Sequence, residues 1–447
     1  MLRYLPVAAF FALYVTYSIV RHAHAGTAGY DLGIFDQAVR GYAHFRAPVV
    51  ALKGPGFNLL GDHFHPILML LAPFYRVWPD ARMLLVAQAL LIAVSIVPIL
   101  RFAERRLGTA RGVAVAVAYG LSWGIQGAVA FDFHEVAFAV PILAFALTAL
   151  ADGRLRASAA WSLALLFVKE DMGLTVAAIG VLVMVRRRWR LGAALTVTGL
   201  VTSALVILVV IPSFNPHGEY RYWNAVGSQS GGLLHTAMVD PGGKLLLLAY
   251  VAGVTAFVAL RSPLALVAVP SLAYRLASDN PLYWSTQVVH YNAILMPIMF
   301  VAFVDGVGRL EADPRPYARR CARLAVPAVL LIAVALVPSH SFRHLYSPRF
   351  YRTPPSARDA HRILPLIPDG ARVAAGNYLA PQLTDRCDVV LFPNVNHVPV
   401  DWVVVDITRM SGVPAPPDQQ EAALNALPSQ GFRRIAQKGG IVLFRRT

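Results

Sequence analysis

Two aspartates early in the chain have the chemistry of an acid–base pair. Asp31 and Asp36 lie five residues apart in the sequence YDLGIFDQ, within a stretch, residues 30–42, that can form an amphipathic helix. On a helix this spacing sets the two side chains about 140° apart, so both reach one spot only if the helix is broken, as Gly33 allows. We expect a carboxylate that removes a proton from a hydroxyl group; the alternative is that Asp31 caps the helix and Asp36 is solvated.

Two further motifs combine imidazoles with carboxylates. They are GDHFHP at residues 61–66 and FDFHE at residues 131–135. Alternate residues of an extended segment share a face, so the two histidines of the first motif could ligate one metal ion and the second motif could complete the shell. Zn²⁺ or Mn²⁺ would suit the mixed set, and Mg²⁺ or Ca²⁺ the carboxylates alone. The alternative is that the histidines are bonded to neighbouring loops. The candidate metal ligands are Asp62, His63, His65, Asp132, His134 and Glu135.

The sequence Lys169-Glu170-Asp171 places three charges between two apolar runs that are too short to leave them far out in water. Charges at membrane depth are costly and are usually paired. Two interpretations stay open. Either a lysine–glutamate pair locks two helices together, or Lys169 contacts a phosphate group that Glu170 helps to orient.

Two other segments could contribute to such a site. Arg221 lies in the sequence EYRYW, residues 219–223, where its charge could meet a phosphate and the neighbouring aromatic rings suit a membrane interface. His290 and Tyr291 precede a later apolar segment, where a helix cap is an equally good interpretation. By contrast, we interpret the arginine clusters at 186–190 and 315–323 as determinants of membrane topology.

Composition indicates which elements must position these residues. Of the 447 residues, 57% are hydrophobic and 14% are charged, with a mean hydropathy of +0.55, so we expect a polytopic membrane protein. The net charge of +16 is spread over short clusters between apolar stretches, which is not the pattern of a nucleic-acid groove. The expected spans lie near residues 4–20, 83–100, 112–129, 136–151, 157–168, 172–185, 191–212, 244–260, 263–276, 292–305 and 324–338.

The loop charges predict the orientation of these eleven spans. With the N-terminus in the cytoplasm, the arginine clusters at 101–111, 154–156, 186–190 and 309–323 all lie inside, as the positive-inside rule requires. The apolar segment 66–78, broken by Pro73, is then a juxtamembrane or re-entrant helix. All the polar motifs described above fall on the other side. We therefore expect a site on the extracytoplasmic face, in which the helix bundle brings several loops together.

The chain after residue 338 differs in kind. Residues 340–358 are rich in Arg, Pro, Ser and Tyr and read as a linker, and strand-like and helix-like segments follow. Expected strands start at Arg372, Asp388, Asp401 and Gly440, and expected helices cover 377–384 and 418–427. The prediction is a transmembrane domain, 1–338, and a linker with a small extracytoplasmic α/β domain, 339–447. With only two cysteines, no disulfide framework is expected.

The motifs YDLGIFDQ, GDHFHP, FDFHE, VKEDMGL and FNPHGEYRYW, in this order, resemble a bacterial family of polytopic membrane proteins with a domain of unknown function. That family is grouped with the GT-C glycosyltransferases. The resemblance covers most of residues 30–300. It implies a GT-C-like bundle of about eleven transmembrane helices, in the bacterial plasma membrane, whose large first external loop holds a catalytic aspartate. By position Asp31 matches that base and Asp36 is the second carboxylate, although the chain lacks an adjacent Asp-Glu pair there.

The resemblance also implies a reaction. Enzymes of the GT-C superfamily take a sugar from a polyprenyl-phosphate donor outside the cytoplasm and invert its anomeric centre, some with a divalent metal and some without. We therefore expect an inverting glycosyltransferase whose partners are a polyprenyl-phosphate sugar, membrane lipids and an unknown glycan, lipid or protein acceptor. Lys169 and Arg221 would stabilise the leaving phosphate. The alternative from another class is a transporter or flippase, which predicts polar residues on both faces and repeated halves. A sensor or assembly factor would leave the motifs unexplained.

Overall fold

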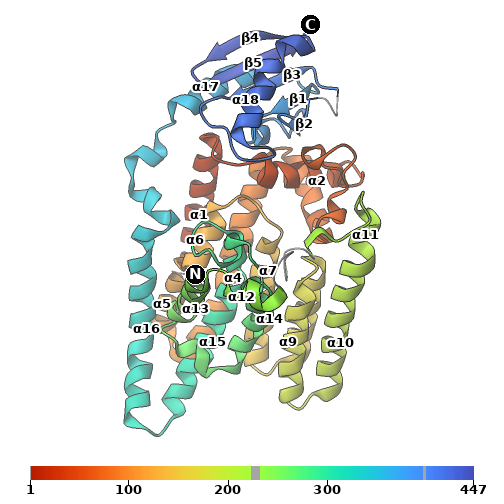
Figure 1. Ribbon diagram of the computed structural model, residues 1–447. Helices are drawn as coiled ribbons and strands as arrows, with labels where there is room; N and C mark the ends of the chain where they lie inside the picture. Colours follow the sequence, from red (N-terminus) through yellow and green to blue (C-terminus); the bar gives the residue numbers. More distant parts are fainter. Residues whose placement is uncertain (1, 223–231, 396–398) are drawn as a thin grey trace.

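The computed structural model describes residues 2–222, 232–395 and 399–447, and shows a helix bundle with a small α/β domain on one end (Figure 1). The helices are α1 (Leu5–Ala23), α2 (Ile34–Ala43), α3 (Ala72–Val77), α4 (Ala81–Leu107), α5 (Thr109–Gly120), α6 (Trp123–Ala130), α7 (Val136–Ala151), α8 (Leu155–Ala164), α9 (Met172–Val185), α10 (Trp189–Leu205), α11 (Ile211–Phe214), α12 (Gly232–Met238), α13 (Pro241–Gly253), α14 (Val269–Leu276), α15 (Leu295–Ala312), α16 (Pro316–Leu336), α17 (Pro355–Ile363) and α18 (Pro417–Ala426).

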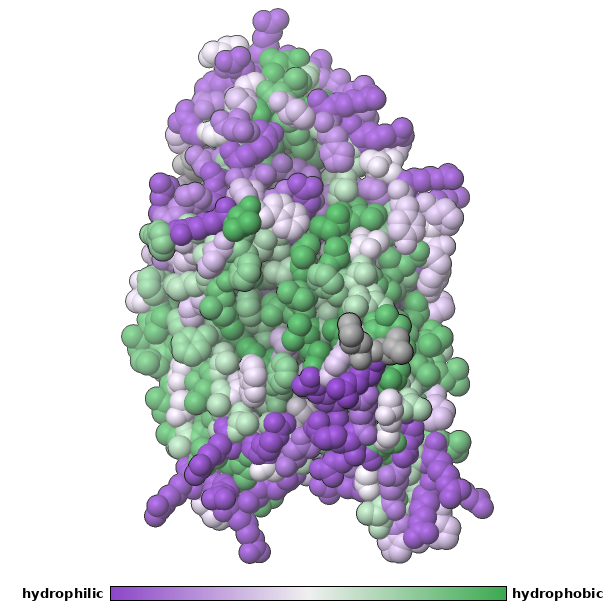
Figure 2. Space-filling view, turned by 180° about the vertical axis from the view of Figure 1, so that it is seen from behind, coloured by the Kyte–Doolittle hydropathy of each residue, from purple (hydrophilic) through white to green (hydrophobic). Residues whose placement is uncertain are grey.

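The bundle is embedded in a membrane. On the face seen in Figure 2, hydrophobic side chains form a band across the middle of the molecule, and hydrophilic side chains gather at both ends. Among the described residues, five helices are long and apolar enough to cross a bilayer, or six if the bent pair α5–α6 forms one span. Five shorter apolar helices of 10–17 residues accompany them, and at 1.5 Å per residue most of these are shorter than a hydrocarbon core of about 30 Å. All eleven expected segments contain helix, but a count of eleven full spans is not confirmed.

Burial separates central helices from peripheral ones. In the apolar window of α4, 67% of the residues are buried inside the protein, and in that of α15, 83% are. The corresponding share is 28% for the windows that contain α1, α10 and α16, so these helices lie at the periphery of the bundle. Because α4 and α15 each pack against α7, these three helices form the core of the bundle. The FDFHE motif lies just before α7, and His290 and Tyr291 lie just before α15.

The α/β domain contains one five-stranded sheet with the strand order β2-β1-β3-β5-β4. The strands are β1 (Arg372–Ala375), β2 (Asp388–Leu391), β3 (Trp402–Asp406), β4 (Phe432–Lys438) and β5 (Ile441–Arg446). Strand β1 pairs in parallel with β2 and β3, and β5 pairs antiparallel with β3 and β4. The four expected strands are therefore present, and β4 is an additional one. Strand β4 was not expected because it contains no apolar run. Most of its side chains are exposed, among them Arg433, Arg434 and Lys438.

One expectation for this region is wrong. The expected helix at 377–384 is only a short 3₁₀ turn, Ala380–Gln382, because the segment packs against the turn at residues 29–33. The expected linker, residues 340–358, contains short 3₁₀ turns and the start of α17, in which Ala357 and Ala360 are buried.

The hairpin of α9 and α10 depends on glycines at its contact face. A side chain on Gly199 would place its Cβ 2.4 Å from the carbonyl oxygen of Gly173, and one on Gly173 would meet the carbonyl oxygen of Gly199 at 2.3 Å. The two backbones therefore touch directly, as in other membrane helix pairs that pack through small residues. This close approach fixes the position of residues 169–171, which connect to the start of α9.

Replacing Gly199 with alanine should destabilise the protein, because backbone atoms cannot move aside as a flexible side chain can. We expect a loss of about 1–3 kcal/mol, the usual cost of overpacking, measured as a lower melting temperature of the purified protein in detergent. Gly308→Ala is the matched control, since Gly308 also lies in a helix and no heavy atom lies within 4 Å of a Cβ built there. An equal effect of both substitutions would contradict the direct contact of α9 with α10.

Candidate active site

Asp31 lies on a turn of π-helix, Gly29–Gly33, between α1 and α2. The α/β domain holds the start of this turn by its backbone: the N–H of Gly29 donates to the carbonyl oxygen of Asn377 at 2.7 Å, and the N–H of Tyr30 donates to the Oδ1 atom of Asn377 at 3.0 Å. Position 29 admits only glycine, because a Cβ there would lie 2.7 Å from that of Ala380. The turn leaves the Asp31 carboxylate 31% exposed, so it is accessible to a reactant.

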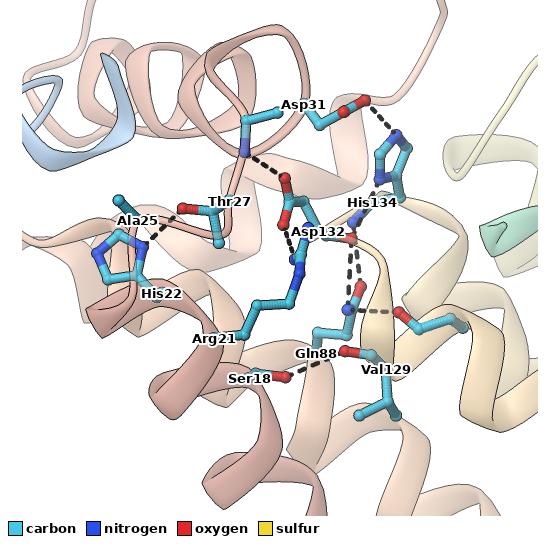
Figure 3. Close-up of polar contacts among 12 residues, drawn as sticks. Ser18, Arg21, His22, Ala25, Thr27, Asp31, Gln88, Val129, Asp132 and His134 are labelled. Atoms are coloured by element: carbon cyan, nitrogen blue, oxygen red, sulfur yellow. Dashed lines mark hydrogen bonds and ion pairs between the residues drawn. The ribbon is translucent and has the colours of Figure 1, made fainter. Parts of the chain in front are cut away.

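The carboxylate of Asp31 faces His134, with 3.7 Å between Oδ1 and Nε2 (Figure 3). The Nδ1 atom of His134 lies 3.2 Å from the carbonyl oxygen of Asp132. Because a carbonyl oxygen only accepts, Nδ1 carries the proton in this contact, and burial lowers the pKa of the ring and keeps it neutral. Nε2 is then unprotonated. Burial, assisted by the negative charge of Asp132, raises the pKa of Asp31 to about 7, so that this carboxyl group exchanges protons near neutral pH.

Asp132 is the buried anchor of the site. It forms an ion pair with Arg21 at the end of α1, and its Oδ2 atom accepts the N–H of Ala28 at 2.7 Å (Figure 3). Gln88 of α4 fixes the same segment, since its Oε1 accepts the N–H of His134 at 3.1 Å and its Nε2 donates to the carbonyl oxygen of Ala128 at 3.1 Å. Three helices thereby determine where Asp31 and His134 meet.

Asp36 does not join Asp31. It lies on α2, fully buried, and its Oδ1 atom accepts the hydroxyl of Tyr75 at 2.8 Å. Burial raises the pKa of Asp36 to about 7. The π-helical turn supplies the break that the sequence suggested near Gly33, but it directs the two carboxylates apart. Of the two, only Asp31 is accessible, and Asp36 is buried within the segment between α1 and α4.

The expected lysine–glutamate pair is present, but its partner comes from another motif. Lys169 Nζ lies 2.9 Å from Glu135 Oε1, and Glu135 is almost fully buried. Glu170 instead approaches His63, whose Nδ1 lies 2.6 Å from its Oε1, and it also accepts the hydroxyl of Tyr220 at 3.2 Å. These contacts join four of the sequence motifs into one network. Lys169 keeps 12% of its side chain exposed.

The remaining candidates lie around this network. Asp62 forms a buried ion pair with Lys53 and accepts the hydroxyl of Tyr222 at 3.3 Å, while His65 is buried under Phe35. His290 stacks on His134 with 3.8 Å between the ring centres.

Tyr291 lies beside His290 with 4.1 Å between the ring centres, and both come from the turn that precedes α15. Arg221 is exposed and forms no ion pair with any described side chain, and Trp223, the last residue of its motif, lies outside the described residues.

The six expected metal ligands do not converge. Asp62 and His63 contact Lys53 and Glu170, whereas Asp132 and Glu135 contact Arg21 and Lys169. Within residues 2–222, 232–395 and 399–447, no group of three His, Cys, Asp or Glu side chains has the arrangement that could hold a metal ion. A bound metal therefore stays a prediction.

Comparisons with known proteins place this geometry in a family. A family model described as "Predicted membrane protein (DUF2079)" matches residues 21–443. The chain belongs to the DUF2079 family. No curated protein sequence matches it. Two crystal structures of ArnT from Cupriavidus metallidurans are similar in fold. The form bound to undecaprenyl phosphate aligns with a TM-score of 0.58 and 14% identity, over 98% of this chain and 97% of ArnT. The apo form aligns with a TM-score of 0.52 and 14% identity, over 98% of each chain.

A third structure, arabinofuranosyltransferase AftD from Mycobacteria, aligns with a TM-score of 0.46 and 13% identity, over 98% of this chain and 39% of AftD. The family match confirms the membrane protein family that the sequence motifs suggested, and the ArnT structures show a similar fold.

Four residues of the site lie outside the sequence motifs and were not predicted: Arg21, Lys53, Gln88 and Asn377. A signal existed for the two cations, because Arg21 and Lys53 fall on the face of the predicted topology where basic residues are scarce. Gln88 has no such signal, since one amide in an apolar helix is unremarkable. Asn377 could not be found either, because its partners, Gly29 and Tyr30, lie about 350 residues earlier in the chain.

The Arg21–Asp132 pair of this DUF2079 protein should be required for stability. Arg21→Met leaves the buried Asp132 carboxylate without its counter-ion, which we expect to cost about 3 kcal/mol and to lower the melting temperature in detergent by several degrees. The double variant Arg21→Met, Asp132→Asn removes the unpaired charge and should recover part of the loss. If the double variant is as unstable as the sum of the two single ones, the two residues do not interact as described.

Proposed function

We propose that the protein is an inverting membrane glycosyltransferase that transfers a sugar from a polyprenyl-phosphate donor to a hydroxyl group of an acceptor. The observation that carries this proposal is Asp31, an accessible carboxylate with a pKa of about 7 at the end of a GT-C-like bundle. The similar ArnT structure was crystallised with undecaprenyl phosphate, which supports a lipid phosphate of that class as the leaving group here.

In this proposal Asp31 acts as the general base. A base is most effective when its pKa lies near the working pH, and burial next to Asp132 raises that of Asp31 into this range. Asp31 takes the proton of the acceptor hydroxyl, whose oxygen forms a bond to the anomeric carbon. The bond from that carbon to the phosphate oxygen breaks at the same time, and polyprenyl phosphate leaves with the electron pair. Attack opposite to the leaving group inverts the anomeric centre.

His134 lies beside the Asp31 carboxyl group, and stacking on His290 holds its ring in that orientation. Its unprotonated Nε2 is an acceptor, so it interacts favourably with Asp31 once that group has taken up the proton. The leaving phosphate requires positive charge. Arg221 is exposed and forms no ion pair among the described residues, so its guanidinium is available to bind a phosphate. Lys169 has two N–H groups beyond the one that meets Glu135, so it can share in this contact.

We also propose that the site faces away from the cytoplasm, as does the α/β domain. The arginine-rich loops 152–156 and 186–190 lie at the end of the bundle opposite to the sheet (Figure 1). Arginines in short loops favour the cytoplasmic side. A donor whose phosphate lies at the interface while its tail remains in lipid would then reach Asp31 from the outer leaflet.

Asp31→Asn should reduce transfer by about 10²–10⁴-fold, the usual contribution of a general base, without changing the melting temperature. The measurement is release of polyprenyl phosphate from a panel of labelled polyprenyl-phosphate sugars by the purified protein in nanodiscs. In the wild type, the rate should rise with pH and level off above about pH 7, because the unprotonated carboxylate is the active form. Asp36→Asn is the matched control and should retain activity, since Asp36 is buried away from Asp31.

The same assay with a chelator decides whether a divalent metal takes part. Release that persists in Asp31→Asn would remove this residue as the base. If no donor releases polyprenyl phosphate and none binds, the glycosyltransferase proposal fails, and transport of a lipid-linked substrate becomes the better interpretation.

A further inference from the structure

A basic hollow lies at the end of the bundle opposite to Asp31. It has a volume of about 880 Å³ and is formed where the start of α8 meets the start of α10. Five arginines line it, and all are exposed: Arg154, Arg156, Arg187, Arg188 and Arg190. Among the described carboxylates, only Asp152 approaches one of them, with 3.4 Å between its Oδ2 and Nη2 of Arg154, and Asp152 is shared with Arg105. The hollow therefore has a large excess of positive charge.

The positive charges in this hollow are unfavourable for the two helices that begin there. The N-terminus of a helix carries a partial positive charge and is stabilised by acidic residues or by a capping side chain. Helix α8 and helix α10 begin after Arg154 and Arg188, with no acidic residue in the first turn and no side-chain cap. Arginines thus add to the positive ends of both helices. An anion between the two helix ends would offset this repulsion.

A second hollow of about 610 Å³ adjoins the first, because both are lined by Arg187 and Trp189. Its other lining residues are apolar: Val181, Met184 and Val185. Trp189 is 67% exposed. Tryptophan rings prefer the boundary between the headgroups and the hydrocarbon of a bilayer. With Trp189 at that boundary, the charged hollow would meet the headgroups and the apolar one the hydrocarbon.

We propose that these two joined hollows bind one anionic phospholipid, with its phosphate headgroup among the arginines and the beginning of an acyl chain along Val181, Met184 and Val185. Basic pockets between helices at a membrane surface are suited to such headgroups. A soluble phosphate or nucleotide would explain the arginines but would leave the apolar hollow unused. This site is separate from the one at Asp31 and does not depend on the proposed reaction.

Fluorescence of Trp189 tests the proposal. The full-length protein is placed in nanodiscs of phosphatidylcholine with increasing fractions of phosphatidylglycerol, and one of the two lipids carries brominated acyl chains that quench tryptophan on contact. The signal of a Trp189→Phe variant is subtracted to isolate this residue. We expect brominated phosphatidylglycerol to quench Trp189 at a fraction at least about fivefold lower than brominated phosphatidylcholine does, as one basic residue near an anionic surface already provides. Equal quenching by the two lipids would overturn the proposal.

Two double variants distinguish a specific lipid site from general electrostatic attraction between the protein and anionic lipids. Arg154→Gln, Arg188→Gln removes charge from the hollow and should abolish the preference, whereas Arg319→Gln, Arg320→Gln removes the same charge from exposed positions on α16, outside the hollow, and should leave it intact. Arg154→Lys, Arg188→Lys keeps the charge and should retain most of the preference even if glutamine disturbs folding.

Equal loss in both glutamine variants would show diffuse attraction to the membrane and contradict a lipid site.

Discussion

The site depends on one constraint, which is that charges at the end of an apolar bundle must find counter-charges within the protein. Arg21, Lys53 and Lys169 each neutralise one buried carboxylate, and the pairs of Arg21 and Lys169 join segments that are distant in the sequence. Because little water reaches these groups, removing one partner would leave the other uncompensated. The pairs therefore hold the loops in place. Asp31 differs from the other carboxylates in this region because its side chain stays partly exposed and ends near a neutral histidine.

The helices could be predicted from the sequence because long apolar runs have no other stable location. The strands of the α/β domain followed from short apolar segments, and β4 was missed because its edge position leaves polar side chains exposed. Many residues of the site could also be found, since charged and imidazole side chains between apolar runs are costly unless they have a role, but Gln88 and Asn377 could not. Their pairing could not be predicted. The sequence suggested that Glu170 is the neighbour of Lys169, but the fold brings Glu135 to the lysine and His63 to Glu170.

The same comparison explains why Asp31 and Asp36 could not be told apart beforehand. Both lie in one loop, and burial raises the pKa of each to about 7. In the structure, the two carboxylates differ in solvent exposure. Asp36 points into the loop against Tyr75, while the π-helical turn directs Asp31 toward His134. A turn of this kind has no clear signature in the sequence, because its geometry is imposed from outside by the backbone and side chain of Asn377.

This dependence on Asn377 has a consequence for how the protein is made. A ribosome completes the segment between α1 and α4 long before it reaches residue 377, and until then the N–H groups of Gly29 and Tyr30 lack the partners that shape the turn. The helices can enter the membrane in this interval, but the turn that carries Asp31 can reach its final form only after the α/β domain has folded onto it. The α/β domain, which is synthesised after the bundle, therefore acts as a late checkpoint, and a chain whose translation stops before it would reside in the membrane without a formed site.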